Sequence, residues 1–139
     1  MIPFLLKDRS RARSAALNEH ATVEFLRTMV ITTPNIIERF HVMFVDAQGT
    51  YVGDAPLGQG RAGGLTVRLR GLFARALSLG ARGIVVAHNH PSGLCRPSDK
   101  DIEATKKLKT VAEALDIQLL DHLIFTTRGV YSMRAGGDL

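Results

Sequence analysis

The sequence predicts an α/β or α+β fold, a sandwich built around a mixed β-sheet that is flanked by helices. Three segments carry apolar residues at helical spacing, short apolar runs typical of strands lie between them, and two of those runs are close enough to form a hairpin. The chain of 139 residues is long enough for one domain with its own hydrophobic core.

Composition places the chain among soluble globular proteins. Hydrophobic residues make up 45% and charged residues 22%, and no apolar run approaches the roughly 18 residues of a membrane span. The charges of "MIPFLLKDRSRARS" follow its apolar stretch, the reverse of a signal peptide, so we expect a cytoplasmic protein. The single cysteine, Cys95, excludes an internal disulfide.

The net charge of +5 is compatible with an acidic partner. A basic cluster lies near the start of the chain, at Lys7, Arg9, Arg11 and Arg13. It is compatible with nucleic acid, but a solvated surface is the favoured interpretation, because no zinc-finger, helix-turn-helix or aromatic RNA-binding motif accompanies it.

The first elements are a helix and a hairpin. Residues 14–30 predict a helix whose inward face carries Leu17, Ala21, Phe25 and Met29, and Pro34 lies beyond its end. Residues 40–45 and 50–52 predict two strands joined by a turn at 46–49. Five glycines follow between Gly53 and Gly64, which favours a flexible surface loop at 53–64.

The next helix is expected from residue 69, ending at Gly80 as its C-cap, and its inward residues are Leu69, Leu72, Phe73, Ala76 and Leu77. The run "GIVVA" predicts a short buried strand that ends at His88.

The C-terminal part predicts one long helix and two strands. The helix starts at Asp99 and turns Leu108, Val111, Ala112 and Leu115 inward. The strands are "QLLDHLIFT" and "VYSM", with a turn at Arg128 and Gly129 between them.

The segment "HNHPSGLCRPSDKD" has the composition of a metal site. His88 and His90 alternate at the end of a strand, so both imidazoles can reach one ion, and Asp99 and Asp101 are candidates for a third ligand. Three protein ligands would leave a fourth zinc position for water, as in catalytic sites. The alternative is a capping box, in which Ser98 and Asp101 only close the start of the helix.

A catalytic zinc site also needs a carboxylate that moves protons. Glu38 precedes the strand at 40–45, which could lie beside the histidine-bearing strand in a mixed sheet. Spacing alone leaves Glu38 either as this acid or as an ordinary exposed glutamate.

The segments "ERFHVMFVD", "GIVVAHNHPSGLCRPSDKDIEATKKL", "LLDHLIF" and "YSM" occur in this order and resemble the RadC family. The C-terminal domain of that family is a JAB/MPN+ (JAMM) metalloprotease-like fold, a cytidine-deaminase-like sandwich. The likeness runs from about Pro34 to Met133. Its signature is matched by five residues, Glu38, His88, His90, Ser98 and Asp101.

The resemblance implies a role for each residue of the signature. His88, His90 and Asp101 would bind zinc, Glu38 would be the general base, and Ser98 would stabilise the oxyanion of a tetrahedral intermediate. We expect the backbone of Ser98 to cap the helix while its hydroxyl faces the metal. Asp99 is then an exposed acid of the first helical turn.

Five other polar residues are expected to lie outside the set that binds zinc or takes part in catalysis. His122 matches the family as well and either supports a metal ligand or is a buried hydrogen-bonded histidine. Asn89 and Ser92 are expected to shape the loop, Cys95 to be a bystander, and His41 to be structural.

The resulting hypothesis divides the chain into a basic segment and helix, residues 1–32, and a RadC-like JAB/MPN+ domain, residues 33–139. The predicted function is a zinc-dependent metallohydrolase that cleaves a peptide or isopeptide amide bond in a protein or peptide substrate. Two alternatives stay open, a nucleic-acid-binding protein of DNA repair or recombination and a non-catalytic MPN interaction module. Nucleic acid would bind through the basic surface, a homodimer is a further option, and no membrane partner is expected.

Overall fold

The computed structural model describes the backbone of residues 15–60 and 68–139 and the side chains of 19–58 and 68–139. The basic cluster of residues 7–13 and the end of the glycine-rich segment lie outside the described residues. The elements follow the order α1 (Ala15–Val30), β1 (Glu38–Val45), β2 (Tyr51–Gly60), α2 (Leu69–Ser78), β3 (Gly83–Asn89), α3 (Asp99–Ala114), β4 (Gln118–Phe125) and β5 (Val130–Ser132).

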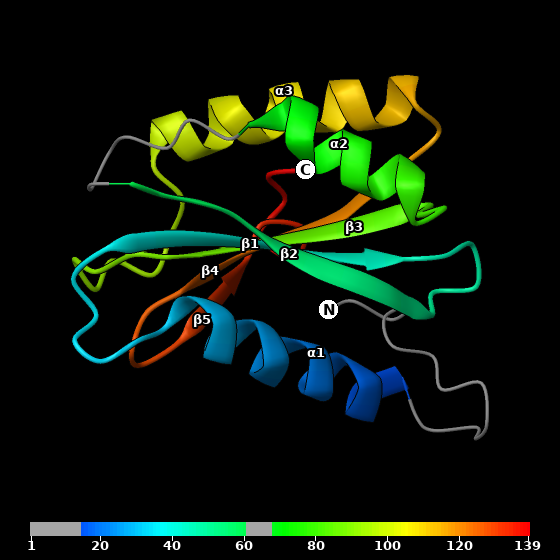
Figure 1. The fold of residues 1–139 in the computed structure, drawn as a ribbon. Coiled ribbons are helices and arrows are strands. Elements are labelled where there is room, and N and C mark those ends of the chain that lie inside the picture. Colours follow the sequence, from blue (N-terminus) through cyan, green and yellow to red (C-terminus); the bar gives the residue numbers. More distant parts are fainter. Residues whose placement is uncertain (1–14, 61–67) are drawn as a thin grey trace.

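The described strands form one mixed sheet in the order β2-β1-β3-β4-β5. β3 and β4 run parallel, since α3 carries the chain across the sheet between them, and the other neighbouring pairs are antiparallel. Helices α2 and α3 cover one face and α1 the other (Figure 1). The predicted α+β fold with a mixed sheet flanked by helices is confirmed.

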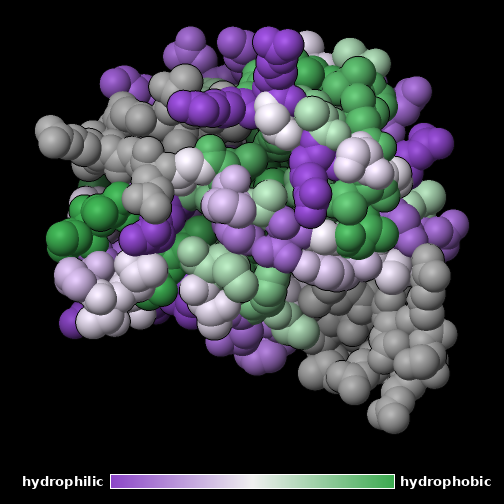
Figure 2. Space-filling view, in the orientation of Figure 1, coloured by the Kyte–Doolittle hydropathy of each residue, from purple (hydrophilic) through white to green (hydrophobic). Residues whose placement is uncertain are grey.

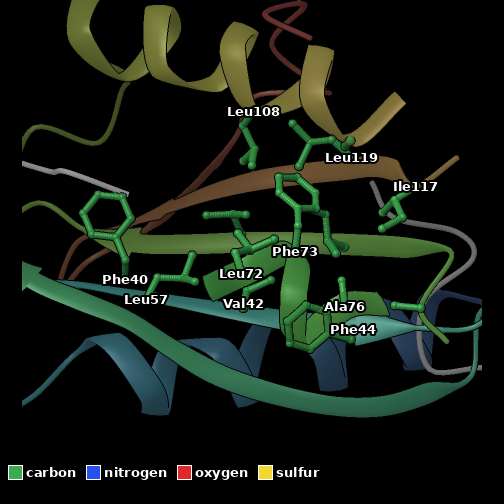
Figure 3. Close-up of a cluster of buried hydrophobic side chains, with 14 residues drawn as sticks. Phe40, Val42, Phe44, Leu57, Leu72, Phe73, Ala76, Leu108, Ile117 and Leu119 are labelled. Carbon is green, nitrogen blue, oxygen red and sulfur yellow. The ribbon is translucent and has the colours of Figure 1, made fainter. Parts of the chain in front are cut away.

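Alternation along β1 gives the sheet two apolar faces. Phe40, Val42 and Phe44 belong to the cluster under α2 and α3, whereas Met43 and Val45 belong to the cluster under α1. Figure 3 shows the first cluster, with Leu108 pointing from α3 toward the strands. The central strands are therefore buried on both sides, which makes them a rigid support for side chains at their ends.

Helix α1 buries a different face from the predicted one. Leu26 and Val30 are fully buried, whereas Met29 is 37% exposed and Ala21 is exposed as well. The buried residues Thr22, Leu26 and Val30 lie one position beyond the predicted stripe, so the helix is rotated by about 100°, one residue on a helix of 3.6 residues per turn.

The predicted hairpin is confirmed at its turn but not along its second strand. The amide of Gly49 donates to the carbonyl of Asp46 at 3.0 Å, and Gly49 has a φ of 76°. The expectation of a loop from Gly53 is wrong, because β2 continues to Gly60 and pairs with β1 as far as Glu38. Pairing with a long central strand outweighs the local preference of a glycine-rich segment for a loop.

The remaining elements match their predicted places, with small corrections at their ends. Leu79 is the C-cap of α2, and Gly80 follows it with a φ of 66°. Leu77 and Leu115 were expected to face inward but are 57% and 38% exposed. β3 continues through His88 to Asn89, so His90 is the first residue beyond the strand.

The surface is mixed in character. Figure 2 shows hydrophilic side chains along the upper edge, where α3 runs in Figure 1, with apolar side chains between them. Among the described helices, none is long and apolar enough to cross a membrane.

Candidate metal centre

Three elements bring four predicted site residues together at one end of the sheet. Phe40 of β1 pairs with His88 of β3, and Glu38, two residues before Phe40 on β1, lies near His90 just beyond the end of β3. Asp101 reaches them from the first turn of α3. The ligand atoms of Glu38, His88, His90 and Asp101 all lie within 4.8 Å of one another.

The ring of His90 is oriented by a backbone carbonyl. Its Nδ1 lies 2.8 Å from the carbonyl oxygen of Leu94, and because a carbonyl only accepts, Nδ1 carries the hydrogen. In the neutral ring Nε2 is therefore bare. It lies 3.0 Å from Oδ2 of Asp101 and 2.9 Å from Nε2 of His88. This is the tautomer in which Nε2 can bind a metal ion.

The charges of these groups are strongly coupled. Burial lowers the pKa of His88, although Asp101 opposes this effect. Burial alone would raise the pKa of Asp101, but its interactions with the imidazoles of His88 and His90 lower that pKa by more than burial raises it, so Asp101 stays ionised. Its hydrogen bond in turn raises the pKa of His90. A cation between these groups, either a proton on His90 or a metal ion, would be stabilised by the Asp101 carboxylate.

Glu38 is buried, with 6% of its surface exposed, and is not the exposed glutamate that spacing alone allowed. The side chain of Asn89 holds the backbone on both sides of it. Asn89 Oδ1 accepts from the amide of Arg39 at 2.6 Å, and Nδ2 donates to the carbonyl of Ile37 at 2.9 Å and to Asn35 at 2.7 Å. Asn89 was expected only to shape the loop; its position between two candidate ligands was the signal for a larger role.

Ser98 and Asp101 form the capping box as well as belonging to the site. The amide of Ser98 donates to Oδ2 of Asp101 at 2.9 Å, and Oγ of Ser98 accepts from the amide of Asp101 at 3.1 Å. The capping-box interpretation is therefore confirmed, and Asp101 also belongs to the group of residues that could hold a metal ion. The hydroxyl oxygen of Ser98 takes part in this cap and does not only face the candidate site.

The other polar residues lie apart from this cluster. Asp99 is exposed, as predicted for an acid of the first turn. Sγ of Cys95 is half-buried near the carbonyl of Ile124, at 3.8 Å. His41 binds Asp54 at 2.6 Å and packs edge-on against Phe25 of α1, on the opposite side of β1.

His122 is buried beside the candidate ligands. It lies on β4, with Nε2 2.7 Å from Nδ1 of His88 and Nδ1 2.8 Å from Oγ1 of Thr105. The ring of Phe40 stacks on His88 from the other side, at 4.4 Å between centroids. His88 is thus held by β1, β4 and α3 together.

A cavity of about 530 Å³ opens beside the cluster. Its described lining includes Glu38, His90, Ser98 and Asp101, with Leu94 and Pro97 at the loop. A substrate group of moderate size therefore has room next to the cluster of Glu38, His88, His90 and Asp101.

The sequence profile of the RadC-like JAB domain family matches residues 16–138. The chain belongs to this family. The match covers every described helix and strand of the domain, including the end of the sheet where the cluster lies.

Curated relatives carry the family's UPF0758 name. The domain is 42% identical over 95 residues to a UPF0758 protein of Flavobacterium johnsoniae, covering 68% of this chain and 42% of the relative. It is 36% identical over 132 residues to one of Paraburkholderia xenovorans, covering 95% and 51%. The chain therefore spans about half the length of the curated relatives that it matches.

The donor set fits a transition metal. Two imidazole nitrogens and a carboxylate oxygen, with a second carboxylate in reach, are typical ligands of zinc and other first-row divalent ions. Calcium and magnesium prefer oxygen ligands alone. The cluster could therefore hold a metal ion of the kind that JAB domains bind.

Proposed function

We propose that the protein is a zinc-dependent hydrolase that cleaves a peptide or isopeptide amide bond. The observation that supports this most directly is the approach of His88, His90 and Asp101 to a common point, with the buried carboxylate of Glu38 beside them. Three ligands leave an open coordination position, which distinguishes catalytic zinc sites from closed structural ones.

The residues divide the chemistry between them. His88, His90 and Asp101 hold the zinc ion, which when bound supplies the Lewis acidity that makes water nucleophilic near neutral pH. Glu38 accepts a proton from the attacking water and passes it to the leaving nitrogen of the substrate. The hydroxyl of Ser98, whose oxygen already accepts one hydrogen bond, still has its own hydrogen to donate to the oxyanion.

The experiment compares Glu38→Gln with the wild type on a panel of peptide and isopeptide substrates. Glutamine keeps the shape of the side chain but cannot take a proton, so we expect zinc content near that of the wild type and turnover reduced by about 10² to 10⁴. The matched control is Glu103→Gln, at an exposed position of α3, which should change neither quantity. Loss of zinc from Glu38→Gln would contradict the assignment of Glu38 as the base.

A nucleic-acid-binding function is the alternative with one feature in its favour. Lys100, Lys106 and Lys107 are exposed on α3, in a chain with a net charge of +5. Binding through phosphates would weaken steeply as salt is raised, so affinity for DNA that hardly responds to salt would exclude this mode.

A further inference from the structure

A buried chain of hydrogen bonds connects two of the candidate ligands through residues that the proposed chemistry does not use. It runs from Nδ1 of His88 to Nε2 of His122 at 2.7 Å, and from Nδ1 of His122 to Oγ1 of Thr105 at 2.8 Å. Thr105 Oγ1 then lies 2.6 Å from the backbone carbonyl of Asp101. His88 and Asp101 are thus joined through β4 and α3 by His122 and Thr105, which also line the cavity.

The direction of this chain is fixed at its last member. A carbonyl oxygen has no hydrogen, and two oxygens at 2.6 Å repel each other unless a hydrogen lies between them, so the hydroxyl of Thr105 donates to Asp101. That hydroxyl has one hydrogen and therefore accepts from Nδ1 of His122. A buried imidazole without a carboxylate partner is most stable as the neutral ring, so Nε2 of His122 is bare.

The bare Nε2 of His122 accepts a hydrogen bond from Nδ1 of His88. Consequently the neutral ring of His88 keeps its hydrogen on Nδ1, and its Nε2 presents a lone pair toward Nε2 of His90, 2.9 Å away, and Oδ1 of Asp101, 3.4 Å away. The carbonyl of Leu94 imposes the same tautomer on His90. Both rings therefore turn Nε2 toward the common point at which a metal ion would bind.

We infer that Thr105 and His122 are positioning residues, which set the tautomer and the orientation of His88 and so prepare the cluster for metal binding. The inference deepens the proposed function and rests on its metal-binding part only. Partners that orient a ligand imidazole typically change metal affinity by about 10-fold to 100-fold when they are removed.

The test uses a matched pair of threonines on one helix. Thr105 and Thr110 both donate from Oγ1 to the carbonyl four residues earlier, but Thr110 is exposed and has no histidine contact. Thr105→Val removes the hydroxyl at nearly constant volume, Thr105→Ser restores it, and Thr110→Val controls for the loss of a helical hydroxyl. Zinc affinity is measured by competition with a chromophoric chelator, and thermal unfolding establishes that each variant is folded.

We expect Thr105→Val to bind zinc about 10-fold to 100-fold more weakly than the wild type, with Thr105→Ser and Thr110→Val close to the wild type. In the metal-free full chain, the proton–nitrogen correlation pattern of the imidazoles should show His88 with its hydrogen on Nδ1, and a mixture of tautomers in Thr105→Val. Equal zinc affinity of Thr105→Val and Thr110→Val would overturn the inference.

The tautomer measurement separates this inference from the proposed function. If the wild type bound no zinc, the proposed hydrolase function would be wrong. The role of Thr105 and His122 would still be decided by which ring nitrogen of His88 carries the hydrogen. A hydrogen on Nε2 of His88 in the metal-free wild type would refute it.

Discussion

Asn89 holds the backbone on both sides of Glu38. At the point where β3 ends, its side-chain carboxamide makes the hydrogen bonds that the backbone of a neighbouring strand would otherwise make. Asn89→Ala leaves the amide of Arg39 and the carbonyl of Ile37 without this partner. We expect the free energy of unfolding to fall by about 1–3 kcal/mol, the usual effect of unpaired buried polar groups. Urea unfolding measures this loss, and under the proposed function turnover should fall while zinc content stays near that of the wild type.

Asn35 supplies the control for this prediction. Asn35→Ala removes one hydrogen bond to Asn89 and leaves both backbone contacts beside Glu38 in place. Its effect on stability should be clearly smaller. If the two variants were equally destabilised and equally active, Asn89 would be an ordinary polar residue of the core.

The spacing of single residues predicted part of the candidate site. His88 and His90 come close because alternate side chains of a strand share a face, and Asp101 follows from the start of the next helix. Glu38 could not be placed from spacing, since its position depends on the register of β1 against β3, which no local pattern contains. The orientation of the His88 ring depends on His122, which is 34 residues away in sequence, whereas Leu94, which orients His90, is only four residues from it.

At the scale of single elements, the start of α3 combines capping with the site. Ser98→Ala removes the oxygen that accepts from the amide of Asp101, so we expect a loss of about 1 kcal/mol in the free energy of unfolding. Asparagine is as good an N-cap as serine, and Ser98→Asn should restore most of that stability. Chemical unfolding of the two variants side by side checks this, and equal stability of Ser98→Ala and the wild type would mean that the cap contributes nothing.

The elements themselves were predicted unevenly. Helix α3 has a capping box, a periodic apolar face and a definite end, and its start was predicted at the observed residue. Strand β2 has none of these signals over its glycine-rich half, and only pairing with β1 extends it to Gly60. Helix α1 was predicted correctly in extent, but several apolar stripes fit its sequence and the sheet selects one of them.

At the scale of the whole molecule, the stability of the fold should depend on the buried carboxyl group of Asp121. This residue of β4 accepts hydrogen bonds from the amides of His122 and Arg134 and from Ser132, so it ties β5 and the following segment to the sheet. Burial raises the pKa of Asp121 above its ordinary value of 3.8, although these hydrogen bonds oppose the effect.

The sign of the resulting pH dependence follows from proton binding. A carboxyl group with a raised pKa binds more protons in the folded chain than in the unfolded chain. Its contribution to the free energy of unfolding is therefore complete below pH 3.8, the ordinary pKa of the group, and is lost as the pH rises through its pKa in the folded chain. The free energy of unfolding of the wild type, relative to Asp121→Asn, should therefore fall as the pH is raised from about 4. Urea unfolding over a pH series measures this difference.

The control for this prediction is Asp116→Asn, which changes an exposed carboxyl group whose backbone φ of 57° asparagine also adopts readily. The difference in free energy of unfolding between the wild type and Asp116→Asn, measured over the same pH series, is the baseline with which the Asp121→Asn difference is compared. A difference between wild type and Asp121→Asn that rises with pH would show that the carboxylate is the favoured form in the fold.

The fold class was predictable because it needs only the kind and order of the elements. The five strands and three helices of the described residues, with one helix crossing between β3 and β4, leave few arrangements that bury every apolar face. The site required more, because its residues come from β1, β3 and α3 and meet only when the sheet has this strand order.

The most direct test of the central claim, that His88, His90 and Asp101 hold a metal ion, is the metal content of the purified protein by elemental mass spectrometry. The wild type is compared with a His88→Ala/His90→Ala double variant. We predict about one zinc per wild-type chain and its loss from the variant. A wild type that contains no metal, even after zinc is offered, or a variant that retains it, would contradict the account.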